Sequence, residues 1–349
     1  MNELASSSIN LVALSYPVET AIKMGVMLGL VPVGALVFGY VFLFKMMSHM
    51  QSRLGPMEAG FHGTLQPIAE GIKFIQKEDL MPDQADKRIF GLAPIIVILS
   101  TFLIYAVIPA GPDLVVSDLD TGIFYAMAVG SIGVLGVLMA GWASANKYSL
   151  LGALRAAGQL IAYELPLVLA VVGVVIQAGT MSLSGIVQAQ ATGEIFGFGG
   201  LGNPFILTQF VGFALFMIAA QAELTQAPFD MPVAESELVA GYMTEYSGFR
   251  FLFFFIGEFA TAFGLSAIAA TLFLGGWFFP GLDVDGGTGN FFGPLVLGGK
   301  LMFVAFFIFW FRFTYPRLRE DQLQTFAWKY LIPISLVNIT ATAILKVVF

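Results

Sequence analysis

Long apolar segments alternate with polar stretches along the whole chain. Each apolar segment is close to the roughly 20 residues that a helix needs to cross a bilayer. The pattern predicts eight membrane spans, over residues 24–44, 89–109, 123–143, 159–178, 205–222, 251–274, 295–312 and 330–348. We therefore predict an all-α fold, a polytopic membrane protein whose residues 1–349 form a single integral membrane domain.

The first long polar stretch, residues 45–88, contains an amphipathic segment. One helical face of that segment carries Leu65, Ile68, Ala69, Ile72 and Ile75. Apolar residues at this spacing predict a helix that lies along the membrane surface. The alternative is that the helix forms one wall of a cavity.

Lysine and arginine divide unevenly between the two sides of the predicted bundle. Thirteen of the 16 basic residues follow the first, third, fifth or seventh span. Because basic residues favour the cytoplasmic side, this distribution predicts long cytoplasmic loops after the first and fifth spans and extracytoplasmic termini. Residues 1–22 contain no basic residue, which is unlike a secretory signal or a transit peptide. We expect a multi-pass protein of the cell (inner) membrane, in contact with lipid.

Composition limits the chemistry that the chain can carry. Only 11% of residues are charged and 58% are hydrophobic, whereas soluble proteins carry about 25% charge. The chain has no cysteine, and His49 and His62 lack the spacing of a metal pair. We expect no iron–sulfur cluster, flavin or metal in this chain, so any electron-carrying centre belongs to a different protein of a larger complex. The net charge of −7 gives no indication of nucleic acid binding.

Three glutamates occupy positions where charge is costly. Glu164 and Glu258 fall inside predicted spans, and Glu223 lies at the cytoplasmic end of the fifth span. A charged side chain at the bilayer centre costs roughly 2.5–3.5 kcal/mol on insertion scales, so such groups face water, pair with another residue or are protonated. A neutral glutamate bonded across helices is the structural alternative. Three acids with few bases to pair them favour a proton path.

The second long polar stretch, residues 222–250, concentrates acid. Its carboxylates are Glu223, Asp230, Glu235, Glu237 and Glu245, with no basic residue before Arg250. The interleaved segments "APFDMP" and "ELVAGYM" are too apolar for a free loop. The pattern predicts a folded acidic funnel beside the membrane.

Two basic clusters face the same predicted side as the funnel. They contain Lys147, Arg155, Arg312, Arg317 and Arg319. Such clusters favour docking of a partner surface or compensation of the acidic loop. Plain control of membrane topology is the alternative.

Several long motifs, in order, give the chain a family resemblance. They are "MQSRLGP", "LQPIAEGIKFIQKED", "AGWASANKYSLLGALRAAGQLIAYE", "AELTQAPFDMPVAESELVAGYMTEYSGFRF", "FLGGW" and "RFTYPRLREDQLQTFAWK". Over nearly its whole length the chain resembles the H-subunit family of NADH-quinone oxidoreductase (respiratory complex I). Members of this family are eight-helix membrane proteins that form most of the quinone chamber.

The resemblance implies roles for these residues that composition does not show. It implies a subunit that binds quinone as substrate and is not catalytic alone. The implied quinone chamber includes Arg53, Asp230, Glu235, Glu237, Glu245, Tyr246 and Arg250. The implied proton path begins with Glu223 and Glu164, and we add Glu258 to it because of its position inside a span. Implied partners are peripheral-arm subunits, including the quinone-reducing subunit and the one carrying the terminal iron–sulfur cluster, and membrane-arm subunits that include antiporter-like ones.

The chain also departs from the family pattern. Leu43 and Phe44 stand where charged residues are usual, Gln226 where an arginine is common, and Val233 where a glutamate is common. These changes indicate a divergent branch. A related complex fed by deazaflavin, ferredoxin or hydrogen stays an alternative, as do an independent ion transporter and a purely structural anchor.

Overall fold

The structure is a computed structural model that describes residues 16–193, 202–233, 235–280 and 287–348. Every regular element in these ranges is a helix, which confirms the predicted all-α fold. Seven helical segments of the described chain are long and apolar enough to cross a membrane.

Five of the long segments are single helices: α4 Lys87–Ile104, α5 Gly122–Ala143, α6 Lys147–Ala178, α10 Gly248–Phe273 and α11 Gly287–Thr314. The other two are built from several helical pieces. In the first, α1 Tyr16–Phe38 continues through a π-helical segment Gly39–Met46 into α2 Met47–Met50, and in the second, α12 Glu320–Phe326 continues through a π-helical segment Ala327–Leu331 into α13 Ile332–Val348. The shorter helices are α3 Gln66–Gln76, α7 Leu183–Thr192, α8 Phe210–Glu223 and α9 Glu235–Leu238.

The fifth predicted span is the exception in length. It corresponds to α8, which has 14 residues and is therefore about 21 Å long, less than the roughly 30 Å of a hydrocarbon core. Before α8 the backbone turns, and the buried Gln209 there bonds Thr342 (2.7 Å) and Asn338 (3.1 Å) of α13. Irregular backbone inside a membrane is tolerated where protein surrounds it. Eight full-length spans are thus not confirmed.

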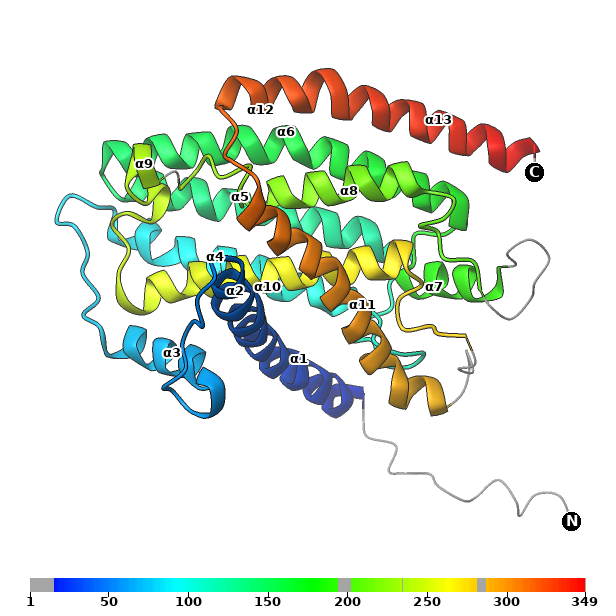
Figure 1. Cartoon of the computed structure of the whole chain (residues 1–349), viewed down its shortest axis with the longest axis horizontal. Helices are drawn as coiled ribbons and strands as arrows, with labels where there is room; N and C mark the ends of the chain where they lie inside the picture. The colour runs from blue at the N-terminus through cyan, green and yellow to red at the C-terminus, as the bar shows by residue number, and fades with distance from the viewer. Residues whose placement is uncertain (1–15, 194–201, 234, 281–286, 349) are drawn as a thin grey trace, which may run out of the picture.

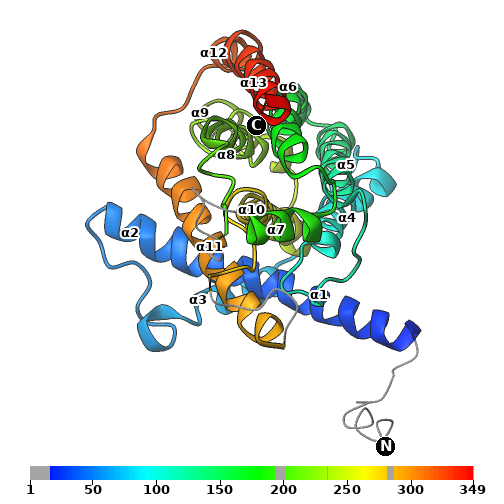
Figure 2. The same cartoon turned by 90° about the vertical axis from the view of Figure 1, so that its right-hand side faces the viewer.

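Five helices form the centre of the molecule. Figure 1 shows α4, α5, α6, α8 and α10 running roughly parallel, with α12 and α13 lying along α6. Both α1 and α11 cross this group obliquely, and the view along the bundle in Figure 2 shows α11 on the side away from α4 and α5. The start of α1, the end of α13 and α7 lie at the opposite end from α3 and α9 (Figure 1). Which membrane face each end occupies stays a prediction.

Helix boundaries follow capping residues rather than hydropathy alone. The Asn146 side chain accepts from the backbone N–H of Tyr148, so α6 begins at Lys147, twelve positions before the predicted span. It ends at Gly179, whose φ of 78° is a left-handed cap that suits glycine. Lys147 and Arg155, predicted to lie in a loop, are therefore on the first turns of a long helix.

Small residues allow the central helices to approach closely. A Cβ at Gly136 of α5 would lie 2.6 Å from a methyl carbon of Val97 on α4, and one at Gly141 would lie 2.2 Å from the Cβ of Ala153 on α6. In lipid, close packing of this kind is a main force that holds helices together. Gly152 of α6 has the same role against the acidic loop, because a Cβ there would lie 2.7 Å from the Cα of Gly241.

The predicted amphipathic helix is confirmed as α3. Its Phe74 ring stacks on Phe251 of α10 with centroids 5.5 Å apart. Ile68, Ile72 and Ile75 remain exposed on the other side. An apolar face exposed beside a membrane bundle fits the interfacial prediction, and the position of α3 in the bilayer stays a prediction.

We predict that Gly152→Ala weakens the fold by separating α6 from the acidic loop. The added methyl meets backbone atoms of Gly241 and Tyr242 at 2.7–2.8 Å, which cannot move as a flexible side chain does. Overpacking of this kind costs about 1–3 kcal/mol, measured as a lower thermal midpoint of the purified protein.

Gly158→Ala is the matched control on the same helix. Its Cβ would meet only the side chain of Gln324, at 3.8 Å. Equal midpoints for the two variants would contradict the close contact between α6 and the loop.

Candidate functional site

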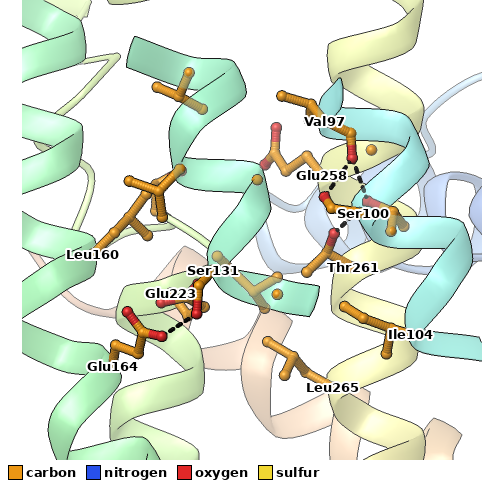
Figure 3. Close-up of a pocket in the computed structure, with 18 of the residues that line it drawn as sticks. Val97, Ser100, Ile104, Ser131, Leu160, Glu164, Glu223, Glu258, Thr261 and Leu265 are labelled. Carbon is orange, nitrogen blue, oxygen red and sulfur yellow. Dashed lines mark hydrogen bonds between the residues drawn. The ribbon is translucent and has the colours of Figure 1, made fainter. Parts of the chain in front are cut away.

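A cavity of about 110 Å³ lies at the centre of the bundle. Residues of α4, α5, α6, α8 and α10 line it, together with the segment after α8 and Tyr242. The lining is largely apolar, and three carboxyl groups enter it, those of Glu164, Glu223 and Glu258. Figure 3 shows Glu164 and Glu223 close together beside Ser131, with Glu258 coming from the ribbon across the cavity. The structure therefore brings together the three acids that the sequence predicted as a proton path.

Glu164 and Glu223 form the first pair. The Ser131 hydroxyl of α5 donates a hydrogen bond to Glu164. Glu223, in the last turn of α8, interacts electrostatically with Glu164, and its buried Oε2 has no hydrogen-bond partner among the described residues. Two carboxylates in an apolar cavity repel each other, so simultaneous ionisation of both is disfavoured. The pair is suited to holding a proton.

Glu258 is held differently, by a base and an amide. Arg312 of α11 lies 3.1 Å from its Oε1, and the Gln226 amide donates to the same oxygen over 3.4 Å. Both members of the ion pair are about one quarter exposed. Arg312 was predicted to face a partner protein. Its guanidinium also neutralises Glu258, an ion pair that the sequence did not predict.

Hydroxyl groups extend the polar lining between α4 and α10. The side chains of Thr101 and Thr261 hydrogen bond each other at 3.0 Å. Thr101 and Ser131 also bond backbone carbonyls one turn earlier on their own helices. The sequence did not single out these hydroxyls, although polar residues inside apolar spans are a usable signal of a functional interior.

The acidic loop is folded, as predicted. Phe229, Met231, Leu238 and Tyr246 are buried. Its turn at Gly241 packs on α6, and Tyr242 forms part of the cavity wall. Burial raises the pKa of the Tyr242 hydroxyl, and the nearby charges of Glu258 and Asp230 raise it further. Tyr242 is therefore a neutral hydroxyl at neutral pH.

Glu237 and Glu245 of the acidic loop have separate partners, and one funnel formed by all the loop acids stays a prediction. Glu237 receives hydrogen bonds from Arg155 and Arg317, both at 2.6 Å, and lies on the surface. Glu245 accepts from the Asn146 amide at the start of α6. Glu235 is the first residue of α9, and its side chain lies outside the described part of the structure. Two arginines outside the loop therefore balance the charge of Glu237, which looked uncompensated in the sequence.

Other predicted chamber residues lie away from the cavity. The Tyr246 ring stacks on Phe90 at 4.0 Å and its hydroxyl donates to the Phe90 carbonyl, while burial raises its pKa. Arg250 pairs with Asp79 at 3.3 Å, and Arg53 bonds Gln51 at 2.8 Å. None of the three lines the cavity.

The remaining residues of the two basic clusters contact near neighbours in sequence. Lys147 lies over the Tyr148 ring, and Arg319 forms a bidentate pair with Asp321. No group of three or more metal-ligating side chains occurs among the described residues.

Comparison with known proteins decides the family. A family model described as NADH dehydrogenase matches residues 22–343, which is most of the chain. The chain belongs to the NADH dehydrogenase family. It is 46% identical over 321 residues to the H subunit of the NADH-quinone oxidoreductase of Brevibacillus brevis, covering 91% of each chain. It is 45% identical over 317 residues to the corresponding protein of Bacillus mycoides, covering 90% of this chain and 91% of that relative.

Membership in the NADH dehydrogenase family confirms the resemblance that the motifs indicated. With its seven apolar helices, the chain is a multi-pass membrane protein. The family match spans all three cavity acids and both arginines that hold Glu237.

We predict a pH-dependent contact at Glu237. Hydrogen bonds from Arg155 and Arg317 hold the pKa of its carboxyl below the ordinary value. A lowered pKa means that the contact is complete above the ordinary glutamate range and is lost as the pH falls through the lowered value. Amide hydrogen exchange over residues 237–240, corrected for intrinsic rates, should be faster in Glu237→Gln at neutral pH. The wild-type rate should approach that of the variant only in acid.

Glu70→Gln provides the control, because Glu70 pairs with Lys73 on the surface of α3. It should leave exchange over residues 237–240 unchanged. Identical exchange in wild type and Glu237→Gln at neutral pH would show that the two arginines do not hold the loop.

Proposed function

We propose that this chain is the quinone-site membrane subunit of an NADH-quinone oxidoreductase and that its acid-lined cavity carries protons. The convergence of Glu164, Glu223 and Glu258 on one cavity of about 110 Å³ is the observation that carries this proposal. The names of the relatives support the assignment of the complex. The bound substrate is a quinone, and the chain contributes no catalytic centre by itself.

Electrons reach the quinone from outside this chain. With no cysteine, the chain cannot hold an iron–sulfur cluster through thiolates. The proposed donors are peripheral-arm subunits that dock on the end of the bundle where α3 and α9 lie (Figure 1). Lys147 is the first residue of α6 and Arg317 bonds Glu237 of α9, so both are close to this end, where we propose that such a partner docks. The proposed exit for protons is toward other membrane-arm subunits.

The acidic loop is the proposed link between quinone and cavity. We assign Asp230, Glu235, Glu237, Glu245, Tyr246, Arg250 and Arg53 to the surroundings of the quinone chamber. The loop packs on α6 through Gly152 and contributes Tyr242 to the cavity wall, so one folded unit contacts both regions. A change of charge beside the loop is thereby felt in the cavity.

The proposed coupling is electrostatic. Reduction of a quinone to the quinol takes up two electrons and two protons, and negative charge is present until the protons arrive. In a low-dielectric interior such charge acts far more strongly than in water. It favours protonation of Glu223, and the change then passes to Glu164, with which Glu223 interacts, and onward to Glu258.

We predict that Glu223→Gln and Glu164→Gln each slow proton pumping by about tenfold or more, because a positioned proton-transfer group commonly contributes 10²-fold or more. Glutamine keeps the size and hydrogen bonding of each side chain and removes the titratable proton. Quinone reduction and proton uptake should be measured together in native membranes, per assembled complex. Glu70→Gln, on the surface of α3, is the control that should retain both rates.

The outcomes distinguish the alternatives. Full rates of quinone reduction and pumping in Glu223→Gln would refute the proton path. Loss of assembly with normal turnover of the remaining complex would indicate a structural anchor. Proton or ion transport by the purified chain alone in liposomes would indicate an independent transporter.

A further inference from the structure

Two of the three cavity acids have a partner that can both donate and accept a hydrogen bond. Ser131 contacts Glu164, and Gln226 contacts Glu258. We infer that Ser131 and Gln226 are positioning residues that keep these acids hydrogen bonded in both protonation states, so that a proton can be taken up and released without leaving a buried group unpaired. The inference rests on the proposed proton path and adds residues and a chemical reason to it.

Gln226 is buried beside Glu258. It is 2% exposed, and its Nε2 donates to Glu258 Oε1 at 3.4 Å. Its own Oε1 is buried and has no hydrogen-bond partner among the described residues. An ionised carboxylate only accepts, and the amide N–H meets that need; a protonated carboxyl carries a donor, and the amide oxygen can receive it after the amide turns.

Arg312, the other partner of Glu258, cannot do the same. A guanidinium has five donors and no acceptor, so Arg312 stabilises only the ionised acid. A second arginine beside Glu258 would favour the ionised acid further, so the acid would take up a proton only at lower pH. The amide at position 226 leaves Glu258 with one cationic partner and one neutral partner.

Ser131 has the corresponding geometry at Glu164. Its hydroxyl has one hydrogen and two acceptors in reach, the carboxyl of Glu164 and the Met127 carbonyl at 3.2 Å. With Glu164 ionised, Ser131 donates to it. With Glu164 protonated, the acid donates to the Ser131 oxygen and the hydroxyl turns to Met127. Figure 3 shows this hydroxyl directed at Glu164 and next to Glu223.

The other charged groups around these acids are few. Glu223 of α8 faces Glu164, and Arg312 of α11 faces Glu258. Tyr242 of the loop is close enough to feel both Glu258 and Asp230. All of these groups stay in place in variants of Ser131 and Gln226, so a change in pH dependence reports the loss of the hydrogen bond itself.

The test measures proton pumping and quinone reduction as functions of pH in the assembled complex. Gln226→Met and Ser131→Ala remove the donor to the ionised acid, so release of a proton becomes harder. The acid limb of the pumping profile should move to higher pH, by about one unit for each variant. Ser131→Thr, which keeps a hydroxyl, should restore the profile.

Gln226→Arg should act in the opposite direction. A second guanidinium beside Glu258 favours the ionised form, so proton uptake fails earlier as the pH rises. The alkaline limb of the profile should move to lower pH. A role in packing alone would lower activity at every pH without moving the two limbs in opposite directions.

Gln221→Met is the matched control. Gln221 is also 2% exposed and also has a buried Oε1 without a partner among the described residues, but its amide donates to the Ala227 carbonyl and not to an acid. Its profile should keep the wild-type limbs. Unshifted limbs in Gln226→Met, Ser131→Ala and Gln226→Arg, with pumping still lost in Glu223→Gln, would overturn this inference alone. Normal pumping in Glu223→Gln would instead overturn the proton path itself.

Discussion

Carboxyl groups in an apolar bundle need either a partner or a proton, and this constraint organises the interior of the protein. Glu164 and Glu223 lie together in the cavity, where the Ser131 hydroxyl donates to Glu164 and one buried oxygen of Glu223 has no hydrogen-bond partner among the described residues. Glu258 has a cation and an amide. The lining of the cavity is largely apolar, so the free energy of each charge state depends strongly on the few polar atoms beside each acid. That dependence is what makes the acids responsive to charge created nearby.

The last turn of α11 and the segment that follows it connect the cavity to the surface of the molecule. Arg312 reaches Glu258, the backbone N–H of Leu318 donates to the Pro228 carbonyl at 2.9 Å, and Arg317 reaches Glu237. Within seven residues, one segment thus contacts an acid of the cavity, the backbone of the acidic loop and an acid on its outer face. A partner that docks on this end of the bundle would contact side chains that are one or two contacts away from Glu258. The basic residues predicted for partner binding and the acids predicted for proton transfer are consequently parts of one connected arrangement.

Much of the fold was readable from hydropathy, and the departures have physical causes. Seven spans were found close to their predicted places because about 20 apolar residues cannot be accommodated elsewhere. The start of α6 was missed because an asparagine cap and good helix formers such as leucine and alanine extend the helix about three turns before the uninterrupted apolar run. The length of α8 was missed because the turn before it is stabilised by Gln209 bonding to α13, over 120 residues away in sequence. Such contacts have no local signature.

By itself, the sequence determined that this is a helical membrane protein and which family its motifs resemble. It also determined that three acids occupy positions in or beside the spans where a charge without a function would be too costly. It could do so because the cost of burying charge depends on residue type and depth, both of which hydropathy reports. Only the tertiary structure decided the partners of each acid. Arg312 and Gln226 meet Glu258, and Ser131 meets Glu164, because α11 and the loop pack beside α10 and α5 packs on α6. Hydrogen bonds act over about 3 Å, so which groups pair is fixed by helix packing and not by the order of residues along the chain.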